Sequence, residues 1–399
     1  MAIESHSIRR KNVWVEDSRP LPHLPLETIG EILSRVPVKP LLRFRCVSKS
    51  WRSLISDPKF ARAHLNVASA STDYTHHGLL LTSGFQNPKL KSCSVSSIMH
   101  GQSDSTAVDL DYPFEKTRER VWIEFNGSCN GLVYITVPDF MMYLWNPATR
   151  KSIKLPDIKL PNILYINTCG IGYDNCIDDY KVVVFLGVDV DTFIQERVEV
   201  YTLRTHSWRR IGDCPHSLHV TDSGKFVSGA LHWPSLDSYW NIIVSLDLAK
   251  ETYGEVLQPD YDRDNCLVST VGVLSGCLCV LRHYNDCADV WVMKDYGIRE
   301  SWTKLIAIPY LTPTTKLIAI PYLTPTTPTD NAYSVPLCIL KNNEVLVGNE
   351  MHLVRYCPKD AEFSHPKIQN CFASFSAYPY IESLVSPDSN DGIQQQQQY

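Results

Sequence analysis

The chain has 399 residues, of which 44% are hydrophobic and 20% charged, and its formal net charge is −5 at pH 7. These values are typical of a folded protein of two or three domains. The negative charge excludes a global basic field that would attract nucleic acid. Because no apolar run reaches the length of a bilayer, the sequence predicts no membrane-spanning helix.

Residues 1–20 are polar, with one small basic cluster, and we expect them to be a disordered leader. They contain no apolar segment like that of a secretory signal. The 13 cysteines are odd in number and irregularly spaced, so we expect reduced thiols. Cys277 and Cys279 lie in a strand-like apolar run, where we expect them to be core residues rather than metal ligands.

The first predicted elements are short helices within residues 24–55. Apolar residues recur there at steps of three and four, which is the helical period. Pro25 stands just ahead of the first segment and Pro37 follows it, and both positions suit helix boundaries. Ser48 is placed to cap the third helix. After Asp57-Pro58, Phe60 to Leu65 indicates one or two more helical turns.

These helices can bury only a small core, yet they are unusually apolar, so part of their surface must be shared. One interpretation is a cap that lies on the rest of the chain. The other is a docking module for a partner. A small, polar stretch over residues 67–75 then predicts a linker.

From residue 76 to residue 386 the pattern changes to short runs rich in Val, Ile, Leu, Tyr and Trp, separated by Gly, Asp, Asn and Pro, which indicates an all-β region. Five units of one design recur in it, each with an alternating strand, a polar turn and a second strand. These units cover residues 142–156, 198–212, 243–257, 289–305 and 352–365. A glycine-containing apolar strand precedes each unit. Such spacing predicts propeller blades, about six when an opening copy at 77–84 is included. We expect Trp208, Trp233 and Trp302 to pack between blades.

An exact twelve-residue duplication interrupts this pattern. TKLIAIPYLTPT occupies residues 303–314 and again 315–326. We expect one copy to continue a strand from Trp302 and the other to form an exposed loop. Residues 387–399 end in a glutamine run and are expected to be a disordered tail. No arrangement for nucleophilic catalysis, phosphate binding or metal binding stands out, so we predict no catalytic residue, no cofactor and no metal site.

The helical stretch closely resembles the F-box of plant F-box proteins. The matching residues are Leu24-Pro25, Glu31-Ile32-Leu33, Arg35, Pro37-Val38-Lys39, Leu41 to Lys49, Trp51, Leu54-Ile55, Asp57-Pro58, Phe60 and His64-Leu65. The resemblance implies that residues 21–66 dock on the Skp adaptor of cullin-based ubiquitin ligases. It also implies the docking residues, which are Leu24, Pro25, Ile32, Leu33, Pro37, Leu41, Val47 and Trp51.

Residues 76–386 resemble the F-box-associated, kelch-like domain of the same plant proteins. The residues that carry this likeness are Gly127 to Leu132, Trp145 to Arg150, Gly172-Tyr173-Asp174, Val200-Tyr201, Ser207 to Arg209, Gly229 to Trp233 and Tyr380 to Ser386. The expected fold is therefore an α+β multidomain chain, in which a small helical F-box precedes a propeller-like β-domain that binds a substrate.

Together these features predict a non-catalytic substrate receptor of a ubiquitin ligase of the Skp-cullin-F-box type. Its expected partners are the Skp adaptor, the cullin and RING subunits reached through it, and an unidentified protein substrate, with neither nucleic acid nor membrane. The resemblance places it in the cytoplasm, the nucleus or both. Two alternatives stay open: an F-box scaffold or inhibitor that degrades nothing, and a propeller lectin or enzyme whose helices only add stability.

Overall fold

A computed structural model of the chain describes residues 24–71, 73–83, 88–99, 105–114, 122–190, 193–218, 223–235, 242–263, 266–284, 286–309, 335–340, 342–348, 353–372 and 375–388. The predicted leader, the second copy of the duplication and residues 389–399 of the predicted tail lie outside these ranges. Within the ranges, none of the helices is both long and apolar enough to cross a membrane.

Four helices open the described chain: α1 (Leu26–Leu33), α2 (Val38–Phe44), α3 (Lys49–Ser56) and α4 (Pro58–Ala70). The expected caps are present. Pro25 directly precedes α1, and the Ser48 hydroxyl accepts the Trp51 N–H at 3.1 Å to cap α3. The Asp57 carboxylate caps α4 in the same way, and Pro58 follows at the first helical position, where its missing N–H costs nothing.

The helix α4 is longer than the sequence indicated. We expected one or two turns ending near Leu65, then a linker from residue 67, but the helix continues to Ala70. Small residues dominate its last turn, and alanine is the best helix former. Ala68 is fully buried there, so packing adds to propensity. The connection to the first strand is correspondingly short.

The β-region consists of six four-stranded antiparallel sheets, which we number as blades in chain order. Blade 1 combines β24 (Ser376–Ile381), β1 (His77–Ser83), β2 (Lys89–Ser94) and β3 (Val108–Leu110), with helix α5 (Val95–Met99) between its last two strands. Blade 2 is β4 (Glu124–Cys129), β5 (Leu132–Val137), β6 (Met141–Asn146) and β7 (Lys151–Lys154). Blade 3 is β8 (Ile163–Asp174), β9 (Asp179–Val190), β10 (Phe193–Thr202) and β11 (Ser207–Arg210).

The remaining blades follow the same order. Blade 4 is β12 (Lys225–Val227), β13 (Ala230–Pro234), β14 (Ile243–Asp247) and β15 (Thr252–Val256). Blade 5 is β16 (Val268–Leu274), β17 (Cys277–His283), β18 (Cys287–Met293) and β19 (Trp302–Pro309), with the 3-10 helix η1 (Arg299–Ser301) before its last strand. Blade 6 is β20 (Val335–Ile339), β21 (Val345–Gly348), β22 (Leu353–Cys357) and β23 (Glu362–Ser364).

The expected six-bladed propeller is therefore confirmed, and the five recurring units are the third and fourth strands of blades 2 to 6. The opening copy corresponds to β1, the second strand of blade 1, and the first strand of that blade, β24, comes from a distant part of the sequence. In blade 1, His77 pairs with Ile381 and Thr82 with Ser376, so the last strand closes the ring beside the first.

Hydrophobic clusters fill the contacts between neighbouring blades. One cluster joins Val183 and Phe185 of blade 3 to Leu231 and Trp233 of blade 4, which confirms the expected role of Trp233. Five further clusters in the described residues join the other neighbouring pairs around the ring. Each blade buries a face only by stacking on its neighbour, as expected for a repeat architecture.

Two tryptophans on outer strands also link blades by hydrogen bonds. The Trp208 indole N–H donates to the Pro156 carbonyl at 2.6 Å, and the Trp302 indole N–H donates to the Leu257 carbonyl at 2.9 Å. Both acceptors lie just after the outer strand of the preceding blade. These bonds satisfy a donor that burial would otherwise leave unpaired, and they confirm the predicted packing role of both tryptophans.

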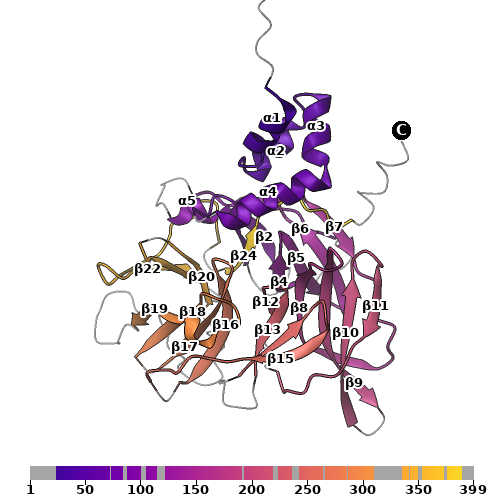
Figure 1. Cartoon of the computed structure of the whole chain (residues 1–399), viewed down its shortest axis with the longest axis vertical. Coiled ribbons are helices and arrows are strands. Elements are labelled where there is room, and N and C mark those ends of the chain that lie inside the picture. The colour runs from indigo at the N-terminus through magenta and orange to yellow at the C-terminus, as the bar shows by residue number, and fades with distance from the viewer. Residues whose placement is uncertain are drawn as a thin grey trace, which may run out of the picture.

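The helices lie at one end of the propeller axis. In Figure 1, α4 lies across that end of the ring, and α1, α2 and α3 stand above it. Strand direction alternates within each blade, so the turns after the first and third strands face α4. The turns after the second strands and the connections between blades lie at the opposite end, which we call the far end. The strands β9 and β10 project from this far end (Figure 1).

Candidate functional site

The four helices form a small module with its own core. Leu33, Leu41, Ile55 and Phe60 are its buried centre. Trp51 packs on that centre and meets the Phe44 ring edge-on, with 5.7 Å between ring centroids. So few buried side chains supply limited stability, and the module depends on further contacts with the propeller.

The structure separates the eight predicted docking residues by exposure. Leu24 is 57% exposed, Ile32 51% and Val47 63%, and Pro25 is also exposed. Leu33 and Leu41, in contrast, are 3% and 0% exposed, so they shape the module and offer no surface to a partner. The remaining two, Pro37 and Trp51, are half-buried.

One apolar surface residue was missed by the sequence reasoning. Leu26, the first residue of α1, is 50% exposed. Leu26 lies three residues before Ile29 and seven before Leu33, in line with the buried face of α1, so the helical period gave no signal of its exposure. With Leu24, Ile32 and Val47 it leaves four large apolar side chains in contact with solvent on one small module.

The opposite side of the module is attached to the propeller through α4. The Arg62 guanidinium forms an ion pair with the Asp178 carboxylate in the β8–β9 turn at 2.6 Å. The His64 ring Nε2 donates to the Val36 carbonyl at 2.8 Å, and the ring stands edge-on against the His76 ring. Burial lowers the pKa of both histidines, so they stay neutral at this contact.

The chain after β24 strengthens the attachment. Leu384 packs against the core of the helical module. The Asn146 side-chain amide of blade 2 donates to the carbonyls of Ser383 at 3.0 Å and Val385 at 2.7 Å. The Ser383 hydroxyl donates to the Asn130 carbonyl at 2.8 Å. The C-terminal segment Ser383–Val385 is therefore held between module and ring, and we call these contacts together the joint.

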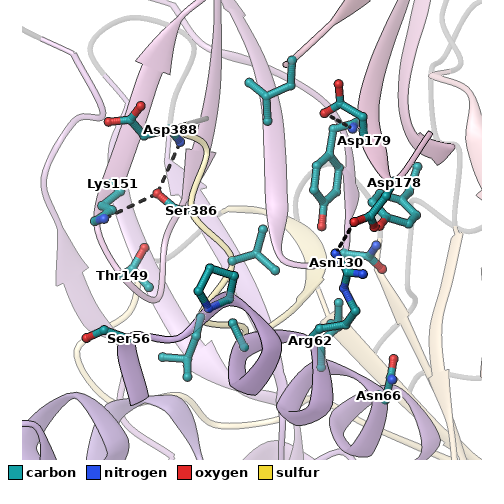
Figure 2. A pocket seen from close by; sticks show the side chains of 18 of the residues that line it. Ser56, Arg62, Asn66, Asn130, Thr149, Lys151, Asp178, Asp179, Ser386 and Asp388 are labelled. Atoms are coloured by element: carbon teal, nitrogen blue, oxygen red, sulfur yellow. Dashed lines mark hydrogen bonds and ion pairs between the residues drawn. The ribbon is translucent and has the colours of Figure 1, made fainter. Parts of the chain in front are cut away.

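A cavity of about 1170 Å³ lies beside the joint, between the helices and the turns of blades 2 to 4. Figure 2 shows Ser56, Arg62 and Asn66 entering from the helices, and Asn130, Asp178 and Asp179 from the opposing turns. Its lining also includes Arg45, Lys49 and Arg52, which form no ion pair with described residues. The helical side of this cavity is therefore basic.

Buried charges elsewhere hold blades together. The Lys181 ammonium of β9 pairs with Asp174 at 2.8 Å and with Glu251 of blade 4 at 3.0 Å, and Arg209 also pairs with Glu251. Burial alone would raise the pKa of Glu251, but the hydrogen bonds from Arg209 and Lys181 outweigh it and lower that pKa. This network joins two blades, and we assign it a structural role.

The cysteines fit the same structural interpretation. Cys279 of β17 is fully buried in the cluster between blades 5 and 6, and Cys277 packs against that cluster, which confirms both as core residues. Burial raises the pKa of the Cys279 thiol to about 12, so it is an unreactive thiol. In the part of the chain that the structure describes, no three potential metal ligands gather.

Comparisons with known proteins match both parts of the chain. Residues 21–62 match the F-box domain, and residues 85–387 match the F-box associated beta propeller domain. The second match alone covers most of the chain. It spans the blades whose turns face the helical module as well as the strands that project at the far end.

Similar proteins align with this chain over most of their length. An F-box/kelch-repeat protein of Arabidopsis thaliana is 33% identical, and the alignment covers 92% of this chain and 97% of that protein. The F-box protein CPR1 of Arabidopsis thaliana is 29% identical, with 91% and 88% covered. Among solved structures, YCF48 bound to D1 peptide aligns with a TM-score of 0.36 at 11% identity over 74% of this chain and 80% of that one.

Proposed function

Because the chain belongs to the plant F-box proteins that carry an F-box associated β-propeller domain, we propose that it is the substrate receptor of a Skp-cullin-F-box ubiquitin ligase. In this proposal the helical module binds the Skp adaptor, and the propeller binds a target protein. The cullin and RING subunits, reached through the adaptor, bring the conjugating enzyme. The chain itself supplies no chemistry.

The observation that carries the proposal is the arrangement of apolar surface on the module. Leu24, Leu26, Ile32 and Val47 are each at least half exposed, whereas the module buries only six apolar side chains of comparable size, which are Leu33, Val38, Leu41, Ile55, Phe60 and Leu65. Burying one such side chain contributes about 1.5–3 kcal/mol. Because each of the four is roughly half exposed, a partner that covered all of them would contribute about 3–6 kcal/mol.

The joint supports the second half of the proposal. A receptor of this kind works by proximity, because it holds a target lysine near the bound conjugating enzyme and so raises its effective concentration. That effect requires a fixed geometry between adaptor and target. The ion pair, the Leu384 contact and the Asn146 hydrogen bonds restrict how the module lies on the ring.

The proposal is tested with the double variant Ile32→Asp/Val47→Asp in the full-length chain. Both side chains are exposed, so the fold should persist, while two carboxylates in an apolar interface lack partners. We expect the affinity for the purified Skp adaptor to fall at least about 100-fold, which corresponds to roughly 3 kcal/mol. Isothermal titration with the adaptor measures this loss.

The matched control is Phe140→Asp. Phe140 is also exposed and lies in the β5–β6 turn at the far end, in a left-handed conformation that aspartate tolerates. We expect this variant to bind the adaptor like the original chain. Equal affinity of the double variant and the control would refute the assignment of this surface to the adaptor.

A further inference from the structure

Blade 3 differs from the other blades by a long extension at the far end. The strands β8 and β9 have 12 residues each and β10 has 10, whereas the outer strand β11 has only 4. The strand β11 pairs with β10 only from Glu199 to Thr202. Residues Phe193–Arg197 of β10 therefore have a described neighbour on the β9 side alone, and we call this segment the free edge.

The backbone groups of the free edge have a definite direction. The Val198 carbonyl accepts the Ile211 N–H at 3.0 Å, so Val198 directs its backbone groups toward the β11 side. Successive residues of a strand alternate, so Ile194 and Glu196 direct their N–H and C=O groups to the same outer side. On that side the described residues offer these groups no backbone partner.

The free edge carries the charged residues Glu196 and Arg197, but it has none of the register shifts, prolines or short length that protect the other outer edges. The ladder between β9 and β10 runs without a register shift from Phe193 to Thr202. The opposite edge of the same extension, on β8, is interrupted by two register shifts. Outer strands elsewhere in the ring are short, with three to five residues, or carry a shift and a terminal proline, as β19 does. Bulges, proline and shortness are the ordinary protections of a sheet edge.

The side chains beside the free edge define what could pair there. Ile194 is 50% exposed and lies directly opposite Asp189 on β9. Glu196 lies on the same face, two residues along, and accepts the Asn167 side-chain amide at 3.0 Å. The carboxylates of Asp189 and Glu196 form no ion pair with a cation among the described residues. The same face also carries Tyr165, which lies over Gly187.

We propose that the free edge binds an extended segment of the target protein as an added antiparallel strand. The inference rests on the proposed function, since it assigns the target-binding part of the propeller. Antiparallel addition places one residue of the segment opposite Glu196 and the residue two positions later opposite Ile194. The acidic face selects lysine or arginine at the first position, and Ile194 selects an aliphatic residue at the second. The recognised pattern is basic-x-aliphatic.

The test uses a displayed library of random seven-residue peptides, selected on the full-length chain. We expect enrichment of basic-x-aliphatic sequences. The most enriched peptide is then synthesised with a fluorophore, and its affinity is measured by anisotropy. For Ile194→Pro, which removes only an outward N–H, we expect at least a tenfold loss of affinity with an unchanged unfolding midpoint. Ile194→Val, the matched control, keeps the N–H and the aliphatic surface and should bind within about threefold.

A second variant tests the charge selection. Glu196→Lys is expected to enrich an acidic residue in place of the basic one. Selection without a pattern, or equal binding of the enriched peptide to Ile194→Pro and to the original chain, would overturn the proposal. A dimer that light scattering detects and that Ile194→Pro abolishes would also overturn it, because the edge would then pair with a second copy.

Adaptor binding, measured on the same samples, separates this inference from the proposed function. The free edge and the helical module lie at opposite ends of the ring (Figure 1). We therefore expect Ile194→Pro to bind the Skp adaptor normally. If peptide selection fails while adaptor binding is normal, only the proposal for the free edge is refuted. If adaptor binding fails while peptide selection succeeds, the proposed ligase role is refuted and the proposal for peptide binding at the free edge stands.

Discussion

Among single residues, His232 shows how burial couples the fold to pH. Its ring is fully buried in β13, where Nδ1 lies 3.0 Å from the Lys225 carbonyl and Nε2 lies 2.8 Å from the Tyr296 hydroxyl. The carbonyl can only accept, so Nδ1 carries the proton and Nε2 accepts from the tyrosine. Both nitrogens of the neutral ring are satisfied. A second proton would place a charge in the core.

This arrangement predicts acid sensitivity. Burial lowers the pKa of His232 to about 4 from its ordinary value of 6.5. Its contribution to stability is therefore complete above about pH 6.5 and is lost as the pH falls toward 4. The full loss is about 3 kcal/mol. Urea unfolding of the original chain and of His232→Gln between pH 7.5 and 4.5 checks this.

We expect His232→Gln to be less stable at pH 7.5 but to lose less stability on acidification. His64, His76 and His77 also have a pKa lowered by burial, so a reduced slope remains in the variant. If both chains lost stability in parallel as the pH fell, His232 would not be a source of the acid sensitivity.

At the scale of elements, the duplicated segment gives one sequence two possible positions. The first copy supplies β19, which confirms the expectation that a strand continues from Trp302. Trp302, directly before the first copy, is buried, and its indole N–H donates to the Leu257 carbonyl. The residue directly before the second copy is Thr314, which offers no such anchor. This anchor selects the copy that enters the sheet. The loop expected for the second copy stays a prediction, since it lies outside the described residues.

Two equivalent substitutions separate the copies. Ile306 of the first copy is 9% exposed, in the cluster between blades 5 and 6. Ile306→Asp would bury an unpaired carboxylate, and we expect a loss of about 3 kcal/mol or more. Ile318 is the equivalent residue of the second copy, and for Ile318→Asp we expect less than about 0.5 kcal/mol. Thermal unfolding compares the two, and equal destabilisation would contradict the loop assignment.

Elements with a clear apolar periodicity, or with capping and boundary residues at their ends, were predictable from the sequence. The proline and serine boundaries of α1 and α3 were found because caps are local. The paired strands of blades 2 to 6 were found because their apolar alternation repeats. The far extension of β10 was missed, since Phe193–Arg197 mixes apolar and charged residues without alternation. The helix α5 was missed because its five residues are too few to show a period.

For the whole molecule, the geometry between module and ring depends on contacts of unequal strength. The ion pair between Arg62 and Asp178 is roughly half exposed on both sides, and such pairs contribute about 0–1 kcal/mol. Leu384 instead buries apolar surface in the module core. We therefore expect the C-terminal segment to dominate the joint.

Leu384→Asp tests this ranking. The carboxylate would be expelled from the module core, so α4 should detach from the ring more often. We expect hydrogen–deuterium exchange in residues 58–70 to accelerate at least about tenfold. Arg62→Ala, the comparison variant, should leave that exchange nearly unchanged. Faster exchange in Arg62→Ala than in Leu384→Asp would reverse the ranking.

The joint also marks the limit of what sequence reasoning gave for the candidate site. The module and several of its exposed residues, Leu24, Ile32 and Val47, were identified from local pattern and resemblance. The division between core and surface was not, because Leu33 and Ile32 are adjacent and chemically alike. The contact of Leu384 with the module joins distant parts of the chain, and no local period in a single sequence reports such a contact.

The closure of the ring by β24 has a consequence for synthesis. The strand β1 leaves the ribosome soon after the helices, but its inner neighbour β24 is translated only after all the other strands of the ring. At about 5–20 residues per second, β1 waits tens of seconds with one edge unpaired. The segment that directly follows β24 carries Leu384. A chain truncated before residue 376 would lack both β24 and Leu384. Its ring would stay open at β1, and the helical module would lose its apolar contact with the ring.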